Sequence, residues 1–439
     1  MMTNSRRRFL SGLGAGIGTM VLAPSMTANI KLLEEKVSAV RGLPDEIVAQ
    51  DEAFWAEIRK GFDLPQGILN LDNGYCNPLS REGMNDLAKH ASYVQQLPGK
   101  RVESLYDEVT VPDVVGGLAR MLGVPASEIG LVRNATEAMD TVILGLPMKA
   151  GDEIVCSTHD YYAMLDAIEQ RQKREGITVK MLRPPIPFAS NAELVEMYRR
   201  AITTKTKLVL LTHASNVTGQ VYPVKEIAAI AHQKGAEVLV DAAQTLALLE
   251  HKIADLDCDY YGASLHKWLM APVGAGMLWM RKEQMAKVWP LVPSPAYAEG
   301  MLKYSWSGTY PEFISAAAAK PIKFYETLGA SRKEARLRFL TTYWRSKVEG
   351  ADGVRFYTSN DPKASCGLGI FEWEGVDLEA VQKQLWEKEK ILVQYMADHA
   401  GRDTRLRGMR VTPNIYTSTS ELDRFVSSLK QAARQSSTR

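Results

Sequence analysis

The 439-residue sequence has few cysteines, no strong excess of either charge and no long hydrophobic run. Its four cysteines (Cys76, Cys156, Cys258 and Cys366) are far apart and form no CxxC pair, which excludes a zinc ribbon and a dense disulfide framework. Lys and Arg number 53 against 51 Asp and Glu, so no basic excess points to nucleic acid or an anionic membrane. With 46% hydrophobic and 24% charged residues, a largely disordered or collagen-like chain is also excluded.

The first 28 residues differ from the rest of the chain. They contain three arginines and no acidic residue, and the arginines are followed by a short, glycine-rich apolar run. This layout is typical of an export signal, and Arg6-Arg7 followed by Phe9 resembles a twin-arginine signal. A phosphate-binding loop at Gly12–Gly18 is the alternative, but no strand precedes it. We therefore expect a twin-arginine signal peptide over 1–28 and export through that machinery, for example to the periplasm.

Beyond residue 120, short apolar runs alternate with helical patterns. The runs cover Ile129–Val132, Glu153–Ser157, Thr178–Leu182, Lys207–Thr212, Glu237–Val240, Tyr260–Ala263 and Gly276–Met280. Continuous apolar strands separated by helices predict a mostly parallel sheet that is covered on both faces. The last run follows its predecessor too closely for a crossover helix, so we expect it to be antiparallel. The sequence thus predicts an α/β fold with a large, mostly parallel seven-stranded sheet.

The two ends of the chain suggest a second, smaller α/β domain. Residues 31–62 and 80–122 have helical patterns, the second broken at Pro98, and a long loop over 290–311 precedes helical residues 312–348. Two further strands and two helices complete the C-terminal part. The predicted division is a signal peptide over 1–28, an N-terminal segment of the small domain over 29–72, the large cofactor-binding domain over 73–315, and the small domain over 316–439.

Polar residues follow five of the predicted strands, where ligands of such sheets gather. The five segments are Arg133–Glu137, Thr158–Tyr162, His213–Gly219, Val238–Gln244 and Gly262–Trp268. The first could bind an anion at a helix start or be only a helix cap. An aromatic ring in the second could stack on a flat ligand or serve packing. Asn216 in the third is also common in turns.

Asp241 and Lys267 carry the most chemical information. An aspartate that ends an apolar strand is costly without a cationic partner, such as a protonated ring nitrogen, an arginine or a metal. Lys267 lies between a histidine and a tryptophan on a loop of small residues. Desolvation and nearby cations would lower the pKa of its amine and make it nucleophilic.

These motifs together resemble a known family. The segments DAAQ (Asp241–Gln244), SLHK (Ser264–Lys267) and PVGAG (272–276) resemble the class V aminotransferase family of pyridoxal-phosphate enzymes, and in particular its isopenicillin N epimerase-like members. The resemblance runs from about Asn70 to the C-terminus. It implies fold type I, with pyridoxal 5′-phosphate as cofactor.

The resemblance also implies roles for individual residues. Lys267 would hold the cofactor aldehyde as a Schiff base and move the Cα proton, while Asp241 would keep the pyridine nitrogen protonated. Tyr161 would stack on the cofactor ring, and Gln244 would contact the ring oxygen with Asn216 nearby. The cofactor phosphate would be bound by Ala135, Thr136, Ser264 and His266.

Three more features follow from the same resemblance. The loop with Gly308 and Thr309 would reach the cofactor phosphate of a neighbouring subunit, which implies a homodimer. Arg410 would grip the substrate carboxylate, a task that suits a bidentate guanidinium. Asn73 lies in a segment similar to the family's N-terminal active-site strand, and we expect it to contact substrate.

The reaction itself stays open between several outcomes. We favour an aminotransferase acting on an α-amino acid or a substrate containing one, with an epimerase or racemase as the alternative and a lyase behind both. Cysteine desulfuration is disfavoured, because the residues after 391–393 contain no cysteine and Cys366 begins an apolar strand. A non-catalytic ligand-binding module is the alternative outside enzymes.

A metal-dependent hydrolase is a further alternative. His159, Asp160, His213 and Asp241 could supply ligands, although the sequence contains no HExxH motif or paired-histidine spacing.

Overall fold

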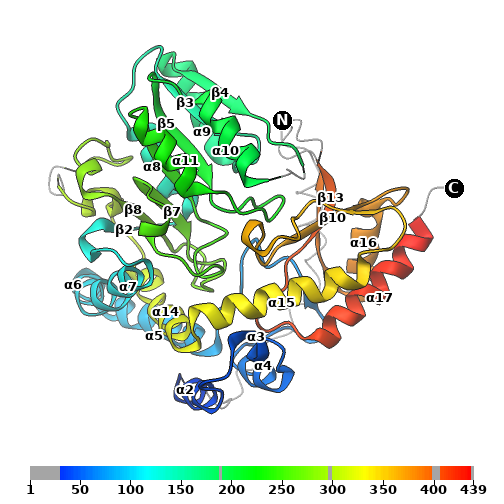
Figure 1. Ribbon diagram of the computed structural model, residues 1–439. Coiled ribbons are helices and arrows are strands. Elements are labelled where there is room, and N and C mark those ends of the chain that lie inside the picture. The colour runs from blue at the N-terminus through cyan, green and yellow to red at the C-terminus, as the bar shows by residue number, and fades with distance from the viewer. Residues whose placement is uncertain (1–29, 187–189, 295–298, 398–405, 437–439) are drawn as a thin grey trace.

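The computed structural model describes residues 30–186, 190–294, 299–397 and 406–436 (Figure 1). The predicted signal peptide over 1–28 lies outside the described residues. A seven-stranded sheet has the order β2-β8-β7-β6-β5-β3-β4, and all neighbours are parallel except those of β8. Its strands are β2 (Ile129–Val132), β3 (Glu153–Ser157), β4 (Thr178–Leu182), β5 (Thr206–Thr212), β6 (Glu237–Asp241), β7 (Tyr260–Ser264) and β8 (Gly276–Met280). The predicted fold class, including the antiparallel last strand, is confirmed.

Helices cover both faces of this sheet because its strands are apolar on both sides. In β5, Val209 and Leu211 belong to one hydrophobic cluster, whereas Leu208 and Leu210 belong to another. This alternation places successive side chains on opposite faces. The first cluster includes residues of α10 (Asn191–Ala201) and α11 (Val224–Gln233), and the second includes residues of α8 (Ala135–Gly145) and α9 (Tyr162–Glu175). Because these helices cover only the two faces, the carboxyl ends of the parallel strands lie together at one uncovered edge of the sheet.

A smaller sheet is built near the C-terminus. Its antiparallel order is β12-β13-β10-β9. The strands are β9 (Val354–Phe356), β10 (Gly369–Trp373), β12 (Gln394–Ala397) and β13 (Arg407–Val411), and the accompanying helices are α16 (Leu378–Glu389) and α17 (Thr419–Ser436). The N-terminal segment runs beside it, since β1 (Leu69–Asn70) pairs in parallel with β11 (Ile391–Leu392) and Asp72 bridges to Thr412.

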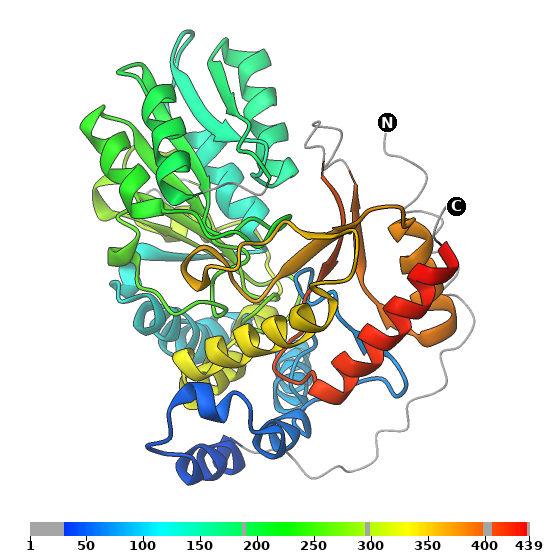
Figure 2. The ribbon, with the colours of Figure 1, turned by 45° about the vertical axis from the view of Figure 1, so that its right-hand side comes forward.

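Long helices join the two sheets, as Figures 1 and 2 show with α15 in yellow. The helical stretch expected over 312–348 is divided into α13 (Glu312–Ala316), α14 (Ala319–Leu328) and α15 (Ala330–Val348). Pro321 has no N–H to donate into a continuous helix, and Gly329 has a positive φ of 94°. The long loop expected over 290–311 contains one short helix, α12 (Leu302–Ser305).

The helical regions near the N-terminus are also divided. The first comprises α2 (Ile30–Ala39), α3 (Asp45–Val48) and α4 (Glu52–Arg59), and the second α5 (Arg81–Gln96), α6 (Pro98–Leu105), the π-helix η1 (Tyr106–Val115) and α7 (Gly116–Leu122). The expected break at Pro98 is the first turn of a new helix, where the missing N–H costs nothing. Single 3₁₀ turns are η2 (Ala126–Glu128), η3 (Ile253–Asp255), η4 (Lys282–Gln284) and η6 (Pro362–Ala364). None of the helices within the described ranges has the length and apolarity that a membrane crossing requires.

Candidate active site

Lys267 lies on the loop that follows β7, and its amine is half-buried beside several ionisable groups. Burial lowers the pKa of this amine to about 8, and the nearby Arg410 acts in the same direction, while Asp241 opposes both. The Nζ atom lies 6.0 Å from the ring centroid of Tyr161. A lowered pKa leaves a larger neutral fraction of the amine near neutral pH, which is the nucleophilic form.

Asp241 ends β6 and is buried. Its Oδ1 atom accepts a hydrogen bond of 2.9 Å from the backbone N–H of Ala243. Burial raises the pKa of this carboxyl group, and the positive charge of Lys267 partly offsets the increase. Among the described residues, no Lys, Arg or His atom lies within ion-pair distance of Asp241. A buried carboxylate in this setting is stabilised by a cationic ligand.

The residues predicted to hold a phosphate meet where β2, β7 and β8 come together. The backbone N–H of Ala135, at the start of α8, donates to Ser264 Oγ over 2.9 Å. A Cβ atom on Gly276 would lie only 2.5 Å from Asn134 Cα, so glycine is what lets β8 approach this helix start so closely. Thr136 follows Ala135 in the same first turn. Backbone N–H groups at a helix start form an anion site.

His266 follows Ser264 by two residues and Gln244 follows β6, and the two side chains differ in how their polar atoms are used. Burial, with a smaller contribution from the Lys267 charge, lowers the pKa of His266 to about 4, so the ring is neutral near neutral pH. Its Nδ1 atom is buried without a hydrogen-bond partner among the described residues. Gln244 donates from Nε2 to Gly74 O (2.9 Å) and accepts at Oε1 from Trp268 Nε1 (2.9 Å). Gln244 therefore links the lysine loop to the N-terminal segment.

Arg410 on β13 brings the small sheet to the same place. Its Nη1 atom donates to the backbone oxygen of Asn216 over 2.9 Å, and its Nη2 atom lies 2.7 Å from Asp72 Oδ1. Asn73 is fully buried, and its side-chain amide bonds to chain atoms that include Thr412 O (2.8 Å) and Tyr416 Oη. The part of Asn73 in substrate binding stays a prediction, because both ends of its amide are engaged by the chain.

Tyr161, Gly308 and Thr309 are three further residues of the predicted site. Tyr161 precedes α9 and packs its ring on Tyr162, with ring centroids 4.4 Å apart. Gly308 and Thr309 are exposed, and Gly308 has a positive φ of 85° that favours glycine. The neighbouring Tyr310 fixes this loop by donating to Gly274 O over 2.8 Å. The role of the loop toward a second subunit stays a prediction.

The residues named for a metal site have other contacts. His159 Nδ1 lies 2.9 Å from Tyr222 Oη, and Asp160 accepts backbone hydrogen bonds from Ser157 and Thr212 at 2.6 and 3.0 Å. The ring of His213 packs edge-on against a second histidine ring. Within the part of the chain that the structure describes, no group of three His, Cys, Asp or Glu side chains is placed to hold a metal ion.

Sequence reasoning missed Asn77 and Lys333, which support the lysine loop. Asn77 Nδ2 donates to Asn73 O (2.8 Å) and Lys267 O (3.0 Å). Lys333 on α15 is 1% exposed, and its amine donates to the backbone oxygen of Trp268. The signal for Lys333 was its spacing of four and seven residues from Leu337 and Leu340, which places it on the apolar face of the helix.

Lys333 should make stability depend on pH. Burial lowers its pKa to about 7 from an ordinary value of 10.5, so between these limits the unfolded chain binds more protons and stability rises with pH. From about pH 7.5 to about pH 9.5, the free energy of unfolding of the wild type should rise by about 2–3 kcal/mol more than that of Lys333→Met. Chemical denaturation at each pH measures this. Lys323→Met, on an exposed position of α14, is the control, and equal slopes for wild type and Lys333→Met would contradict the expectation.

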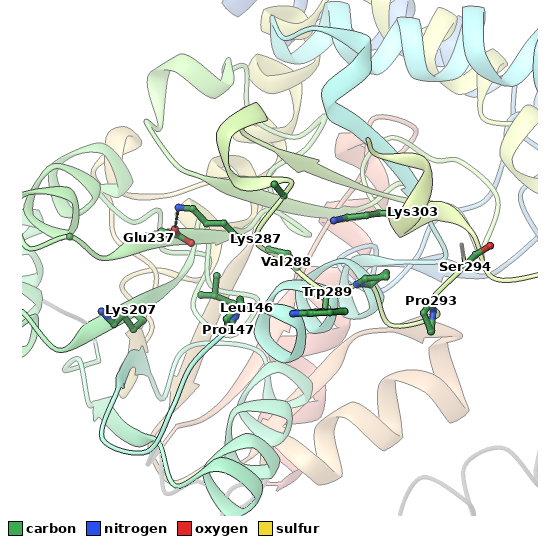
Figure 3. A pocket seen from close by; sticks show the side chains of 13 residues that line it. Leu146, Pro147, Lys207, Glu237, Lys287, Val288, Trp289, Pro293, Ser294 and Lys303 are labelled. Atoms are coloured by element: carbon green, nitrogen blue, oxygen red, sulfur yellow. Dashed lines mark hydrogen bonds and ion pairs between the residues drawn. The ribbon is translucent and has the colours of Figure 1, made fainter. Parts of the chain in front are cut away.

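A cavity of about 860 Å³ lies elsewhere, near the amino ends of β5 and β6 (Figure 3). Lys207, Trp289 and Lys303 line it, and Lys287 lies there in an ion pair with Glu237 at 2.7 Å. None of the predicted site residues lines this cavity. Trp289 is 72% exposed, whereas Trp268 is fully buried beside Gln244, so these two tryptophans do not share one pocket.

The residues at the carboxyl edge fit pyridoxal phosphate in three respects. Asp241 offers a buried carboxylate to a protonated ring nitrogen, and Lys267 offers an amine of lowered pKa to an aldehyde. The third is the helix start at Ala135, where Ser264 Oγ lies against the backbone N–H and the helix dipole favours an anion. His266, which is near Ser264 in the sequence, has a buried Nδ1 atom without a hydrogen-bond partner among the described residues. The cofactor thus matches the chemistry of these groups in charge and in hydrogen-bonding capacity.

Comparisons with known proteins agree with this fit. The family model for aminotransferase class V matches residues 111–425. The chain is 26% identical over 397 residues to isopenicillin N epimerase of Streptomyces clavuligerus, covering 86% of this chain and 98% of that protein. It is 28% identical over 354 residues to a probable cysteine desulfurase of Methanothermobacter thermautotrophicus, covering 77% and 86%.

A solved structure adds the same fold. The chain is similar to C-DES with glycine covalently linked to its PLP cofactor, with a TM-score of 0.74, 20% identity, and coverage of 84% of this chain and 98% of that one. The family model spans most of the sequence, including all of the strands of the large sheet. The chain therefore belongs to the class V aminotransferase family of pyridoxal-phosphate-dependent proteins.

Proposed function

We propose that the protein is an aminotransferase that acts on an α-amino acid or on a substrate containing one. One observation carries this proposal: Lys267, Asp241 and Arg410 lie at the carboxyl edge of the large sheet. Asp241 ends β6, and Arg410 donates to Asn216 O on the loop after β5. The charges of Asp241 and Arg410 both act on the pKa of Lys267. These are the three charged groups that amino-group chemistry needs. They come from a loop after β7, from the end of β6 and from β13.

The chain's own groups divide the work. Pyridoxal phosphate, when bound, supplies an electron-withdrawing ring for the substrate carbon next to the amino group. Asp241 holds a proton at the ring nitrogen, and Lys267 provides the amine that binds the aldehyde and moves the Cα proton. Arg410 orients the substrate carboxylate, and Asn77 holds the Lys267 backbone so that the amine keeps its position.

Epimerisation is the second candidate, and a specific observation favours it. Isopenicillin N epimerase matches this chain over 98% of its own length. Transamination and epimerisation share proton removal by the lysine and differ in where the proton returns.

Cysteine desulfuration also occurs among the relatives. Cys156, Cys258 and Cys366 are buried, and burial raises the pKa of Cys366 to about 12. Cys76 is half-buried, and burial and Asp72 raise its pKa, which disfavours the thiolate. The thiols of this chain thus give desulfuration weak support.

A single incubation series separates the three reactions. The holoenzyme is incubated with L-amino acids without a keto acid, and the products are analysed by chromatography. Transamination is expected, with the cofactor recovered as pyridoxamine 5′-phosphate and a stoichiometric keto acid formed. D-amino acid with unchanged cofactor would establish epimerisation instead, and alanine formed from cysteine, with sulfide released by added dithiothreitol, would establish desulfuration.

We also propose that the protein is exported by the twin-arginine machinery and acts as a homodimer. The support for export is the arginine pair and apolar run within 1–28, and the support for the dimer is the exposed loop at Gly308 and Thr309. Fractionation of cells expressing wild type or Arg6→Lys/Arg7→Lys, and the sedimentation of the purified protein, test the two parts.

A further inference from the structure

The guanidinium group of Arg410 is already engaged by a carboxylate of the chain. Asp72 Oδ1 lies 2.7 Å from Nη2, and the two side chains are only 12% and 7% exposed. The other terminal nitrogen, Nη1, donates to Asn216 O. The remaining nitrogen, Nε, is buried and has no hydrogen-bond partner among the described residues. The guanidinium group thus has one terminal nitrogen on a carboxylate, the other on a backbone oxygen, and one nitrogen without a partner in the described part of the chain.

The chain holds Asp72 firmly in this position. Its backbone N–H donates to Asn70 Oδ1 over 2.9 Å, and Asp72 bridges to Thr412, two residues beyond Arg410. The N–H of Gly74 donates to Thr412 Oγ1 over 3.0 Å. A Cβ atom on Gly74 would lie 3.7 Å from Arg410 Cζ, so the segment runs directly against the guanidinium group. The contact is therefore part of the architecture and not a loose surface pair.

We propose that Asp72 is a specificity-determining residue that competes with the substrate carboxylate for Arg410; this rests on the proposed function. Because the Asp72–Arg410 pair has no net charge, an incoming carboxylate gains little attraction and must share or displace Asp72 at Nη2, with Nε as its new partner. A second negative group on the ligand would be repelled by Asp72. The site is therefore suited to substrates with a single carboxylate, and it disfavours dicarboxylates.

The test measures carboxylate binding and not turnover. Holoenzyme is titrated with propionate, succinate and the neutral propionamide, followed by ligand-observed NMR and by the visible absorbance of the bound cofactor. Asp72→Asn keeps the shape and an oxygen acceptor but removes the charge. We expect the variant to bind propionate about tenfold more tightly than the wild type does, and its gain in affinity for succinate should be larger. Its affinity for propionamide should equal that of the wild type.

Two further variants complete the design. Asp63→Asn removes a carboxylate of the same N-terminal region that pairs with Arg81 at 2.7 Å, and it should leave all three affinities unchanged. In Asp72→Asn/Arg410→Gln the gain should disappear, which shows that Arg410 holds the ligand. Thermal melting of each variant confirms that it is folded.

The outcomes are distinct. Equal or weaker propionate binding by Asp72→Asn would overturn the proposal and make Asp72 a support for Arg410. If Asp72→Asn does not fold, Asp72→Glu is measured instead. Affinities of that variant for propionate and succinate equal to those of the wild type would then overturn the proposal. Failure of the proposed function would look different, as holoenzyme that forms no keto acid from any amino donor while its carboxylate affinities still change with Asp72→Asn as expected.

Discussion

Replacing Lys267 by alanine is expected to abolish turnover, with a loss of at least about four orders of magnitude in kcat. The variant lacks the amine that we propose binds the aldehyde and moves the substrate proton. Purified protein should lose the visible absorbance of the covalently bound cofactor. Borohydride reduction followed by peptide mass spectrometry should find the cofactor on Lys267 of the wild type and on no lysine of the variant.

Lys267→Arg is the matched control, because it keeps a positive charge near Asp241 but cannot form the covalent bond. It should be as inactive as Lys267→Ala while retaining more of the wild-type stability, since Asp241 keeps a cation nearby. Full biological activity of Lys267→Ala would favour a non-catalytic binding module. A borohydride label on another lysine, such as the buried Lys333, would show that Lys267 is not the residue that binds the cofactor covalently.

Asp241→Asn should lower kcat by about two to three orders of magnitude without loss of the cofactor. The asparagine keeps the volume and the hydrogen bond from Ala243 N–H, but it removes the charge that favours a protonated ring nitrogen. The proposed contacts of Lys267 and of the helix start at Ala135 with the cofactor are unchanged in this variant, so its cofactor content should stay near that of the wild type. Stopped-flow absorbance and phosphate analysis of the purified variant give rate and content together.

Asp160→Asn tests whether the loss of kcat in Asp241→Asn comes only from changing a buried carboxyl group. Asp160 is also buried near a strand end, and burial raises its pKa to about 7, so its neutral form is populated in the wild type. Its replacement should change kcat by less than about tenfold, because its hydrogen bonds come from Ser157 and Thr212, which are not among the groups proposed to contact the cofactor. Similar losses for Asp160→Asn and Asp241→Asn would contradict a special role for Asp241.

The local sequence was sufficient for the large sheet. Continuous apolar runs such as Glu153–Ser157 can only be buried on both faces, which determines parallel strands with covering helices. The polar residues that follow such strands necessarily lie at one edge. For this reason Asp241 and Lys267 could be placed near each other from their positions after β6 and β7 alone.

Helix boundaries were less well determined. The break between α13 and α14 depends on Pro321 and on local packing, and the start of α15 depends on the conformation of Gly329. Periodicity indicates that a segment is helical but not where its hydrogen bonds stop.

Only the tertiary structure decided how the ends of the chain complete the site. Nothing near Asp72 or Arg410 in the sequence indicates that they form an ion pair, because 338 residues separate them and the contact depends on the pairing of segments from both termini. The same holds for Lys333, whose contact with Trp268 requires α15 to pass beneath the lysine loop. The sequence by itself determined the sheet, its open edge and the groups that follow its strands. The long-range packing decided which charges neutralise one another, because burial and distance set the energy of a charge and neither can be read along the chain.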